Sequence, residues 1–224
     1  MKVLFVIYKL EYADHIAIAY LSAIAKQLGH LTYFFSLDKN DLILTIDKIR
    51  PDVVAYSANI LGFEELVAAH QRAKKVYHFV SIMGGPHPTF CTETFRESGM
   101  DAYCIGEGEY AFRDFLERIE MGKSFDDVEN LVTANKANPV RPLIENLDEL
   151  PMADRDLVIS NSFLKNTGKK TFYATRGCPF QCSYCCNNYY HKLYKGKGQI
   201  LRRFSVERIL KEIADVRKKY RMDY

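Results

Sequence analysis

The stretch FVSIMGGPHPT at residues 79–89 sets the fold, because a short apolar run ends there in paired glycines. Residues 79–83 have the length and the β-branched and aromatic content of a buried β-strand. Gly84 and Gly85 have no Cβ, so another backbone or a ligand can come close, although paired glycines also serve ordinary tight turns. The stretch therefore predicts a strand that ends in a turn or a ligand loop.

The same alternation of short apolar runs and helical stretches extends from Lys2 to about Met121. Strands are expected at residues 3–8, 31–36, 53–57, 79–83 and 102–105, and helices at 15–28, 41–49, 63–76, 93–98 and 109–120. Apolar strands that alternate with helices are typical of a parallel sheet covered by helices on both faces. The pattern predicts an α/β, doubly wound, flavodoxin-like domain over residues 1–122.

In a sheet of this kind, ligands bind beyond the carboxyl ends of the strands. Ser57 follows the third expected strand, Gly84 and Gly85 follow the fourth, and the stretch GEGE at residues 106–109 follows the fifth. These loops are the candidate ligand site of the domain.

Three cysteines, Cys178, Cys182 and Cys185, are spaced by four and three residues in the stretch TRGCPFQCSYC at residues 175–185. Three thiols at this spacing can converge on one metal centre. Iron-sulfur clusters and zinc usually take four ligands, so one position would stay open for an outside molecule.

Other interpretations of the cysteines are a zinc site and a disulfide framework. A zinc site would add Cys186 or His191 to the three thiols, but Cys185 and Cys186 are adjacent and would tend to point apart. A disulfide framework is disfavoured, because the N-terminus has no secretory character and the thiols are clustered. The simplest interpretation of Cys186, and of Cys91 and Cys104, is packed thiols.

The cysteine spacing, with Tyr184 before the last cysteine, resembles the CxxxCxΦC motif of radical S-adenosylmethionine (SAM) enzymes. The resemblance implies that Cys178, Cys182 and Cys185 hold a [4Fe-4S] cluster whose open iron is chelated by SAM. Reductive cleavage of SAM would then yield a 5′-deoxyadenosyl radical. Tyr184 matches the aromatic position near the adenine of SAM, although its ring fits a packing role equally well.

The order of the chain resembles the radical SAM enzymes that carry an N-terminal cobalamin-binding domain. The stretches GGPHPT at 84–89 and GEGE at 106–109, and the linker NLDELP at 146–151, are similar to that class. The resemblance implies cobalamin as a cofactor and a slot for its nucleotide tail lined by Ser57, Gly84 and Gly85.

One departure concerns the DxHxxG loop, whose histidine ligates cobalt in many cobalamin domains. The corresponding residues 11–17 read EYADHIA, in which Asp14 and His15 are adjacent and no glycine follows. We therefore expect no histidine ligand to cobalt. Asp14 is expected to cap the first helix, with His15 in its first turn. His87 fits either a ligand contact or a polar loop position.

Residues 123–168 are expected to form an ordered, proline-containing connector whose apolar side chains, among them Leu143 and Leu147, pack against a domain. Residues 169–224 are expected to begin a radical SAM partial TIM barrel. Residues 170–175 would form its first strand, residues 187–203 a solvated basic loop, and residues 206–220 a helix capped by Ser205. The resemblance would continue into further βα units, so we expect the chain to be a fragment.

Composition excludes some classes of function. With 48% hydrophobic and 26% charged residues and a formal net charge of +3, the 224-residue chain has no nucleic-acid signature. No apolar run is long enough to span a membrane, and a cytoplasmic location is expected because reduced thiols and an oxygen-sensitive cluster suit it.

The sequence therefore predicts a cobalamin-dependent radical SAM enzyme that methylates or rearranges a small-molecule substrate. The resemblance implies a reductant such as a flavodoxin or ferredoxin. The sequence identifies neither the substrate nor a catalytic residue. The alternative is a non-catalytic cobalamin- or metal-binding module.

Overall fold

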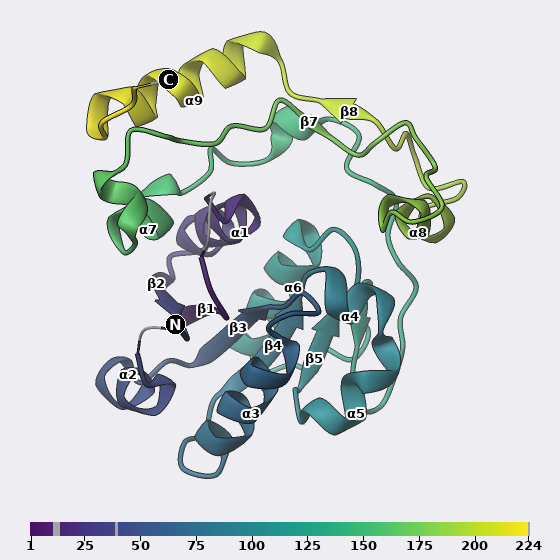
Figure 1. Ribbon diagram of the computed structural model, residues 1–224. Helices are drawn as coiled ribbons and strands as arrows, with labels where there is room; N and C mark the ends of the chain where they lie inside the picture. The colour runs from purple at the N-terminus through teal and green to yellow at the C-terminus, as the bar shows by residue number, and fades with distance from the viewer. Residues whose placement is uncertain (11–13, 39, 224) are drawn as a thin grey trace.

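The computed structural model describes residues 1–10, 14–38 and 40–223. Its central feature is a six-stranded sheet of order β2-β1-β3-β4-β5-β6 (Figure 1). The parallel strands are β1 (Lys2–Ile7), β2 (Leu31–Ser36), β3 (Val53–Ser57), β4 (Val80–Gly84) and β5 (Ala102–Cys104). The predicted flavodoxin-like sheet is confirmed. A sixth strand, β6 (Leu131–Val132), comes from the expected connector and pairs antiparallel with β5.

Helices cover both faces of the sheet. They are α1 (Ile16–Gln27), α2 (Leu42–Ile49), α3 (Phe63–Lys74), α4 (Pro86–Phe90), α5 (Phe95–Ser98) and α6 (Glu109–Glu120), with a 3₁₀ turn at Thr92–Thr94. Alternate strand residues point to opposite faces, so Phe5 packs with α1 and α6 while Leu4 packs with α2 and α3. Both are essentially inaccessible to solvent, as expected for a strand buried on two sides.

The helix α4 corrects a prediction, because the stretch GGPHPT was expected to be a loop. Pro86 stands at the first helical position, where its fixed φ suits a helix and its missing N–H costs nothing. The turn before it is made by Gly85, which has a φ of 102°.

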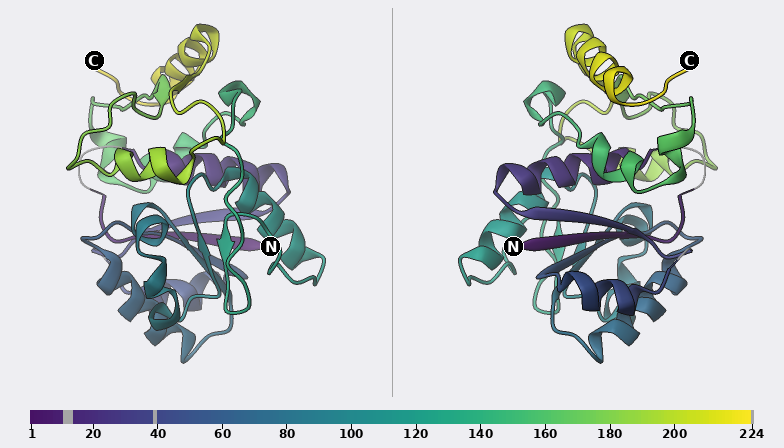
Figure 2. Two further views of the ribbon diagram at one scale, coloured as in Figure 1. Left: turned by 90° about the vertical axis from the view of Figure 1, so that its right-hand side faces the viewer. Right: turned by 90° about the vertical axis from the view of Figure 1, so that its left-hand side faces the viewer.

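The C-terminal third of the chain forms a separate layer over α1 and the carboxyl edge of the sheet (Figures 1 and 2). It contains α7 (Arg155–Ser160), β7 (Thr175–Arg176), α8 (Asn187–Leu193), β8 (Arg202–Arg203) and α9 (Val206–Lys219), and 3₁₀ turns at Leu147–Glu149 and Phe163–Asn166. Leu147 and Leu150 of the connector pack with Tyr20 of α1 and with Phe204. The predicted packing of the connector against a domain is confirmed.

Two expectations for the C-terminal layer were wrong. Residues 170–175 do not form a parallel barrel strand; only Thr175 and Arg176 pair, antiparallel with Arg203 and Arg202. A parallel strand needs a neighbour that runs in the same direction, and the described residues contribute none there. The expected basic loop contains the helix α8, in which the apolar sides of Tyr190 and Leu193 pack inward.

The helix at the C-terminal end agrees with prediction. Ser205 caps α9 by accepting a hydrogen bond from the Arg208 amide at 3.2 Å. Across the described residues, no helix combines the length and apolar character needed to cross a membrane.

Candidate functional site

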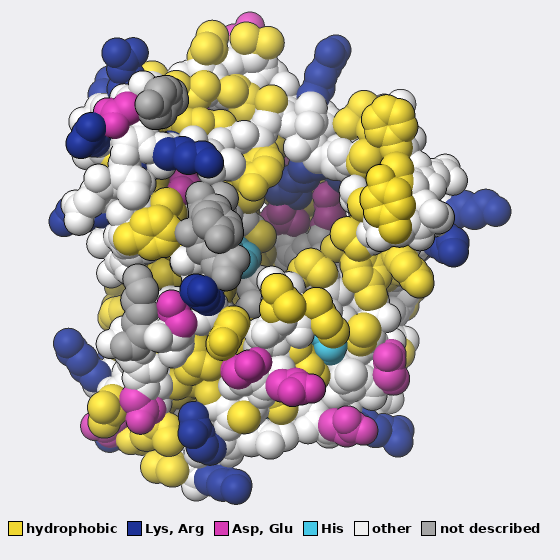
Figure 3. All heavy atoms as spheres, viewed as in Figure 1, with side chains coloured by type: hydrophobic (Ala, Val, Ile, Leu, Met, Phe, Trp, Pro, Cys, Tyr) yellow, Lys and Arg dark blue, Asp and Glu magenta, His cyan; other side chains and the backbone are white. Residues whose placement is uncertain are grey.

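A cavity of about 530 Å³ lies at the carboxyl edge of the sheet, beneath the C-terminal layer. Its floor is formed by the ends of β3, β4 and β5 and the first turns of α1 and α6, and its roof includes Tyr173, Arg176, Tyr190 and Phe204. Figure 3 shows a hollow between the two layers with basic and acidic side chains at its back. The cavity therefore occupies the place where doubly wound sheets bind ligands.

A slot extends from this cavity between the sheet and helices α1 and α6. Its sheet wall carries small side chains, since Ala55, Ser57, Gly84 and Cys104 all line it. Ser57 and Gly84 are direct partners in the β3–β4 register. Small residues at the ends of three adjacent strands leave room for a flat or narrow group to enter beside the sheet.

Gly85 completes this wall and tolerates no side chain. A Cβ at Gly85 would lie 2.7 Å from the Ala58 carbonyl oxygen and 3.3 Å from the Ser57 hydroxyl oxygen. The Thr89 hydroxyl donates to the Gly85 carbonyl at 2.8 Å and accepts from the Gly106 amide at 3.0 Å, which joins the loops after β4 and β5. The structure thus brings together Ser57, Gly84 and Gly85 along one cavity wall.

Cys104 lines the slot as a neutral thiol. It is buried, and burial raises its pKa to about 12. The predicted role as a packed thiol is confirmed.

The two candidate histidines differ in placement. His15 precedes α1 and lines the cavity, and burial lowers its pKa to about 4, so it is neutral at physiological pH. His87 is not among the residues that line the cavity; its ring stacks on Phe63 with a centroid distance of 3.7 Å. His87 therefore packs rather than contacting a ligand there.

The expected helix cap by Asp14 was wrong. No side-chain hydrogen bond caps α1, and the Asp14 carboxylate instead accepts from Arg155 at 2.6 Å. A buried carboxylate gains more from a buried guanidinium than from one backbone amide. Residues 11–13, the rest of the compared loop, lie outside the described residues.

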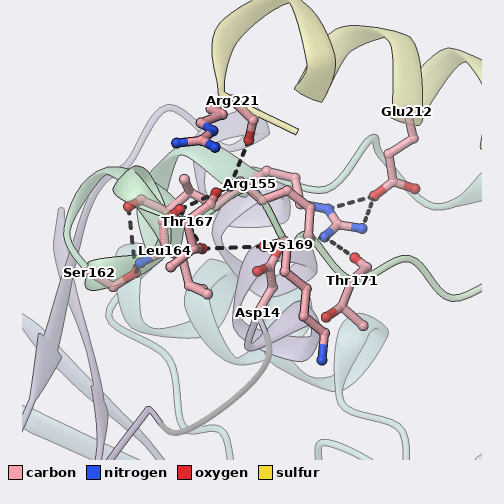
Figure 4. A network of polar contacts seen from close by, with 11 residues as sticks. Asp14, Arg155, Ser162, Leu164, Thr167, Lys169, Thr171, Glu212 and Arg221 are labelled. Carbon is pink, nitrogen blue, oxygen red and sulfur yellow. Dashed lines mark hydrogen bonds and ion pairs between the residues drawn. The ribbon is translucent and has the colours of Figure 1, made fainter. Parts of the chain in front are cut away.

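Arg155 is the centre of a buried ion network that holds the C-terminal layer (Figure 4). Besides Asp14, it donates to Glu212 of α9 at 2.7 Å and to the Thr171 carbonyl at 2.6 Å. The side chains of Arg155, Asp14 and Glu212 are at most 5% exposed. Three distant segments of the chain therefore meet at one guanidinium, and its ion pairs with Asp14 and Glu212 hold the layer over the sheet.

The cysteines lie on the loop 177–201, which β7 and β8 close at its base. Cys178 is partly buried and lines a second cavity of about 230 Å³, and His191 Nε2 bonds to its carbonyl at 2.8 Å. Cys185 is partly buried and Cys182 is exposed. Cysteine thiols are the donors that iron-sulfur clusters use, so the donor set fits a cluster in kind.

The three thiols are not gathered into a formed site. Within residues 1–10, 14–38 and 40–223, no group of three or more His, Cys, Asp or Glu side chains is arranged to hold a metal ion. This applies equally to the zinc alternative with Cys186 or His191. Tyr184 is 91% exposed, so its ring does not pack within this chain.

Sequence reasoning missed the ionic contacts beneath the cysteine loop. Arg202, expected to be solvated, is buried and pairs with Glu107, and Arg176 pairs with Glu107 and Glu109. Both acids belong to the GEGE stretch, which follows the fifth expected strand. The ion pairs could have been anticipated from the opposite charges of that stretch and of the two arginines that flank the cysteine loop.

Known proteins similar to this chain indicate which family the cavity residues resemble. Residues 6–116 match the family described as B12 binding domain. The chain is 29% identical over 220 residues to the "Uncharacterized methyltransferase PH0819" of Pyrococcus horikoshii, covering 92% of this chain and 46% of that protein. It is 28% identical over 181 residues to the "Cobalamin-dependent radical SAM methyltransferase TokK" of Streptomyces tokunonensis, covering 74% of this chain and 25% of that protein.

Among solved structures, the fold matches that of the apo form of the cobalamin-dependent S-adenosylmethionine radical enzyme OxsB. The TM-score is 0.75 at 20% identity, over 97% of this chain and 32% of OxsB. The residues at the carboxyl edge of the sheet thus lie within the part of the chain that matches the B12 binding domain, and the homologues of the chain include a radical SAM methyltransferase. The chain spans less than half the length of each of these relatives.

Proposed function

We propose that this chain is the cobalamin-binding part, with the start of the radical SAM part, of a cobalamin-dependent radical SAM enzyme. One observation carries the proposal. The slot lined by Ser57, Gly84 and Gly85 lies within the residues that match the B12 binding domain, and it opens beneath the layer that bears the cysteine loop. The proposed parts are residues 1–122 for cobalamin, 123–168 as connector and 169–224 as the start of the radical SAM domain.

In this proposal the nucleotide tail of cobalamin enters the slot beside β3, β4 and β5. Ser57 would offer its hydroxyl to the tail, and Gly84 and Gly85 would let it approach the backbone. The apolar rings of Tyr173 and Phe204 and the side chain of Tyr190, which line the roof, would exclude water from the opposite side. We propose no histidine ligand to cobalt.

Cys178, Cys182 and Cys185 would hold a [4Fe-4S] cluster, and Tyr184 would lie near the adenine of SAM. When bound, the cluster supplies one electron for cleavage of SAM to a 5′-deoxyadenosyl radical. The exposure of Cys182 and Tyr184 leaves both side chains accessible for these roles. A small-molecule substrate, a flavodoxin or ferredoxin as reductant and a cytoplasmic location complete the proposal.

Methylation is the reaction outcome we propose first, because both reported relatives are described as methyltransferases. Rearrangement or cyclisation of the substrate is compatible with the same cofactors. A non-catalytic cobalamin-binding module is the second candidate. It is favoured by the lack, among the described residues, of a formed three-ligand metal site.

Electron paramagnetic resonance (EPR) of the anaerobically reconstituted, reduced chain, with and without SAM, separates these candidates. The enzyme proposal expects a cluster signal that changes when SAM is added. Cys182→Ser should abolish the signal, whereas Cys186→Ser, the matched control next to the motif, should keep it. Bound cobalamin without any cluster signal in the wild type would favour the binding module.

A further inference from the structure

Glu107 forms a bidentate ion pair with Arg202. Its Oε2 accepts from Arg202 Nη1 at 2.9 Å, and its Oε1 accepts from Arg202 Nη2 at 2.7 Å. The side chains are only 18% and 6% exposed. Parallel guanidinium–carboxylate bonds of this kind fix orientation as well as position, and low exposure limits their screening by solvent.

The same carboxylate also accepts from Arg176 Nη1 at 3.4 Å. Arg176 and Arg202 are direct partners across the β7–β8 pair. These two residues are therefore the base of the loop 177–201, which carries Cys178, Cys182 and Cys185. One carboxylate of the B12-binding domain thus contacts both ends of the cysteine loop.

Backbone contacts reinforce the arrangement. The Glu107 amide donates to the Tyr194 hydroxyl at 2.6 Å, and Tyr194 follows α8 within the loop. The Ile144 amide of the connector donates to Glu107 Oε2 at 3.1 Å. Glu107 therefore bonds to the two ends of the loop, to its interior and to the connector.

Glu107 also lies between the two cavities and lines both of them. Cys178 lines the smaller cavity, and Ser57, Gly84 and Gly85 line the larger one. Movement of Glu107 or of its arginine partners would change the position of the cysteine loop relative to the slot.

We infer that Glu107 is a positioning residue that sets the place of the cysteine loop relative to the cavity of the B12-binding domain. Glu109 has a smaller share, since its ion pair, with Arg176 at 2.6 Å, reaches only one end of the loop among the described residues. An extension of this inference, that Glu107 also sets the distance between cobalamin and cluster, rests on the proposed function.

Hydrogen exchange followed by mass spectrometry tests, without any cofactor, whether Glu107 holds the cysteine loop in place. Glu107→Gln removes the charge but keeps the shape, and Glu64→Gln, at an exposed position on α3, is the matched control. In Glu107→Gln, amides of residues 174–204 should exchange faster by on the order of tenfold, with β1 and β3 still protected. Glu109→Gln should give a smaller increase, and Glu64→Gln none.

Unchanged protection of residues 174–204 in Glu107→Gln would overturn the inference. If Glu107→Gln fails to fold, Arg202→Lys provides the same test. It keeps the positive charge but loses the two parallel bonds, and protection equal to wild type would again overturn the inference.

The cofactor extension is tested by EPR on protein that holds both cob(II)alamin and the reduced cluster. The spin–spin splitting between the two centres depends steeply on their separation. Glu107→Gln should change or broaden it while both cofactors stay bound. An identical splitting would overturn the extension. A wild-type chain that binds neither cofactor would contradict the proposed function, and hydrogen exchange would still decide the role of Glu107.

Discussion

Arg155 and Asp14 form a buried ion pair at 2.6 Å although 141 residues separate them in the chain. The pair joins the loop after β1 to α7, and Glu212 adds α9 to the same network. His15, next to Asp14, lines the cavity. The Thr171 carbonyl, in the segment that leads to the cysteines, accepts a hydrogen bond from Arg155. The docking of the C-terminal layer therefore depends on charges that are costly to leave unpaired.

Arg155→Met should destabilise the chain by about 3–5 kcal/mol, because Asp14 and Glu212 would be left as buried, unpaired carboxylates. Urea unfolding followed by circular dichroism measures the change. Arg72→Met, at an exposed position on α3, is the control and should change the free energy of unfolding by less than about 0.5 kcal/mol. Equal midpoints for Arg155→Met and wild type would refute a structural role for the network.

The contribution of Glu107 to stability should disappear in acid. Burial tends to raise the pKa of its carboxyl, but Arg202 and Arg176 outweigh burial and hold that pKa below its ordinary value. The stabilisation is therefore complete above the unfolded pKa of about 4.3 and is lost as the pH falls through the lower folded pKa.

This pH dependence is measured as the difference in the free energy of unfolding between wild type and Glu107→Gln. We expect a difference on the order of 2 kcal/mol at neutral pH, shrinking below about pH 4. Comparison of two variants cancels the titration of the other carboxyls. A difference that stayed constant down to pH 3, or that grew, would show that the charge of Glu107 is not what stabilises the contact.

Gly85→Ala should destabilise the domain more than the same change at Gly29. Both glycines have positive φ, at 102° and 82°, so both substitutions strain the backbone. Only at Gly85 would the new Cβ meet another atom, the Ala58 carbonyl oxygen at 2.7 Å, whereas none lies within 4 Å at Gly29. We expect a loss of about 2–4 kcal/mol at Gly85 and about 1–2 kcal/mol at Gly29. Thermal unfolding measures the loss of stability in both variants. Equal losses would mean that the backbone around Gly85 shifts to accept the Cβ at no cost in free energy.

The doubly wound sheet was predictable from sequence, because each strand is a short apolar run and its helices are amphipathic and local. Ser57, Gly84 and Gly85 could also be brought together, since the ends of adjacent parallel strands share one edge. Asp14 could not be placed correctly. The preference of aspartate for the N-cap position predicted a helix cap. Its partner in the structure, Arg155, lies in a distant segment whose sequence does not indicate that contact.

The C-terminal layer was less predictable for the same reason. Arg202 stands among lysines and was interpreted as a solvated residue, because its charge partner Glu107 is 95 residues away. Residues 170–175 have strand propensity, but pairing depends on a neighbouring strand rather than on propensity. The ligand roles of Cys178, Cys182, Cys185 and Tyr184 remain predictions, since the described side chains do not form the metal site.

Cobalamin binding by wild type and Gly84→Val tests the central claim most directly. A Cβ at Gly84 would meet only Cys104, at 3.8 Å, so the valine is expected to fold while its side chain fills the slot. Equilibrium dialysis against aquacobalamin should show one bound cobalamin per wild-type chain and an affinity at least about tenfold weaker in Gly84→Val, with similar melting temperatures. No binding by the wild type, or equal binding by a folded Gly84→Val, would contradict the assignment of this slot to cobalamin.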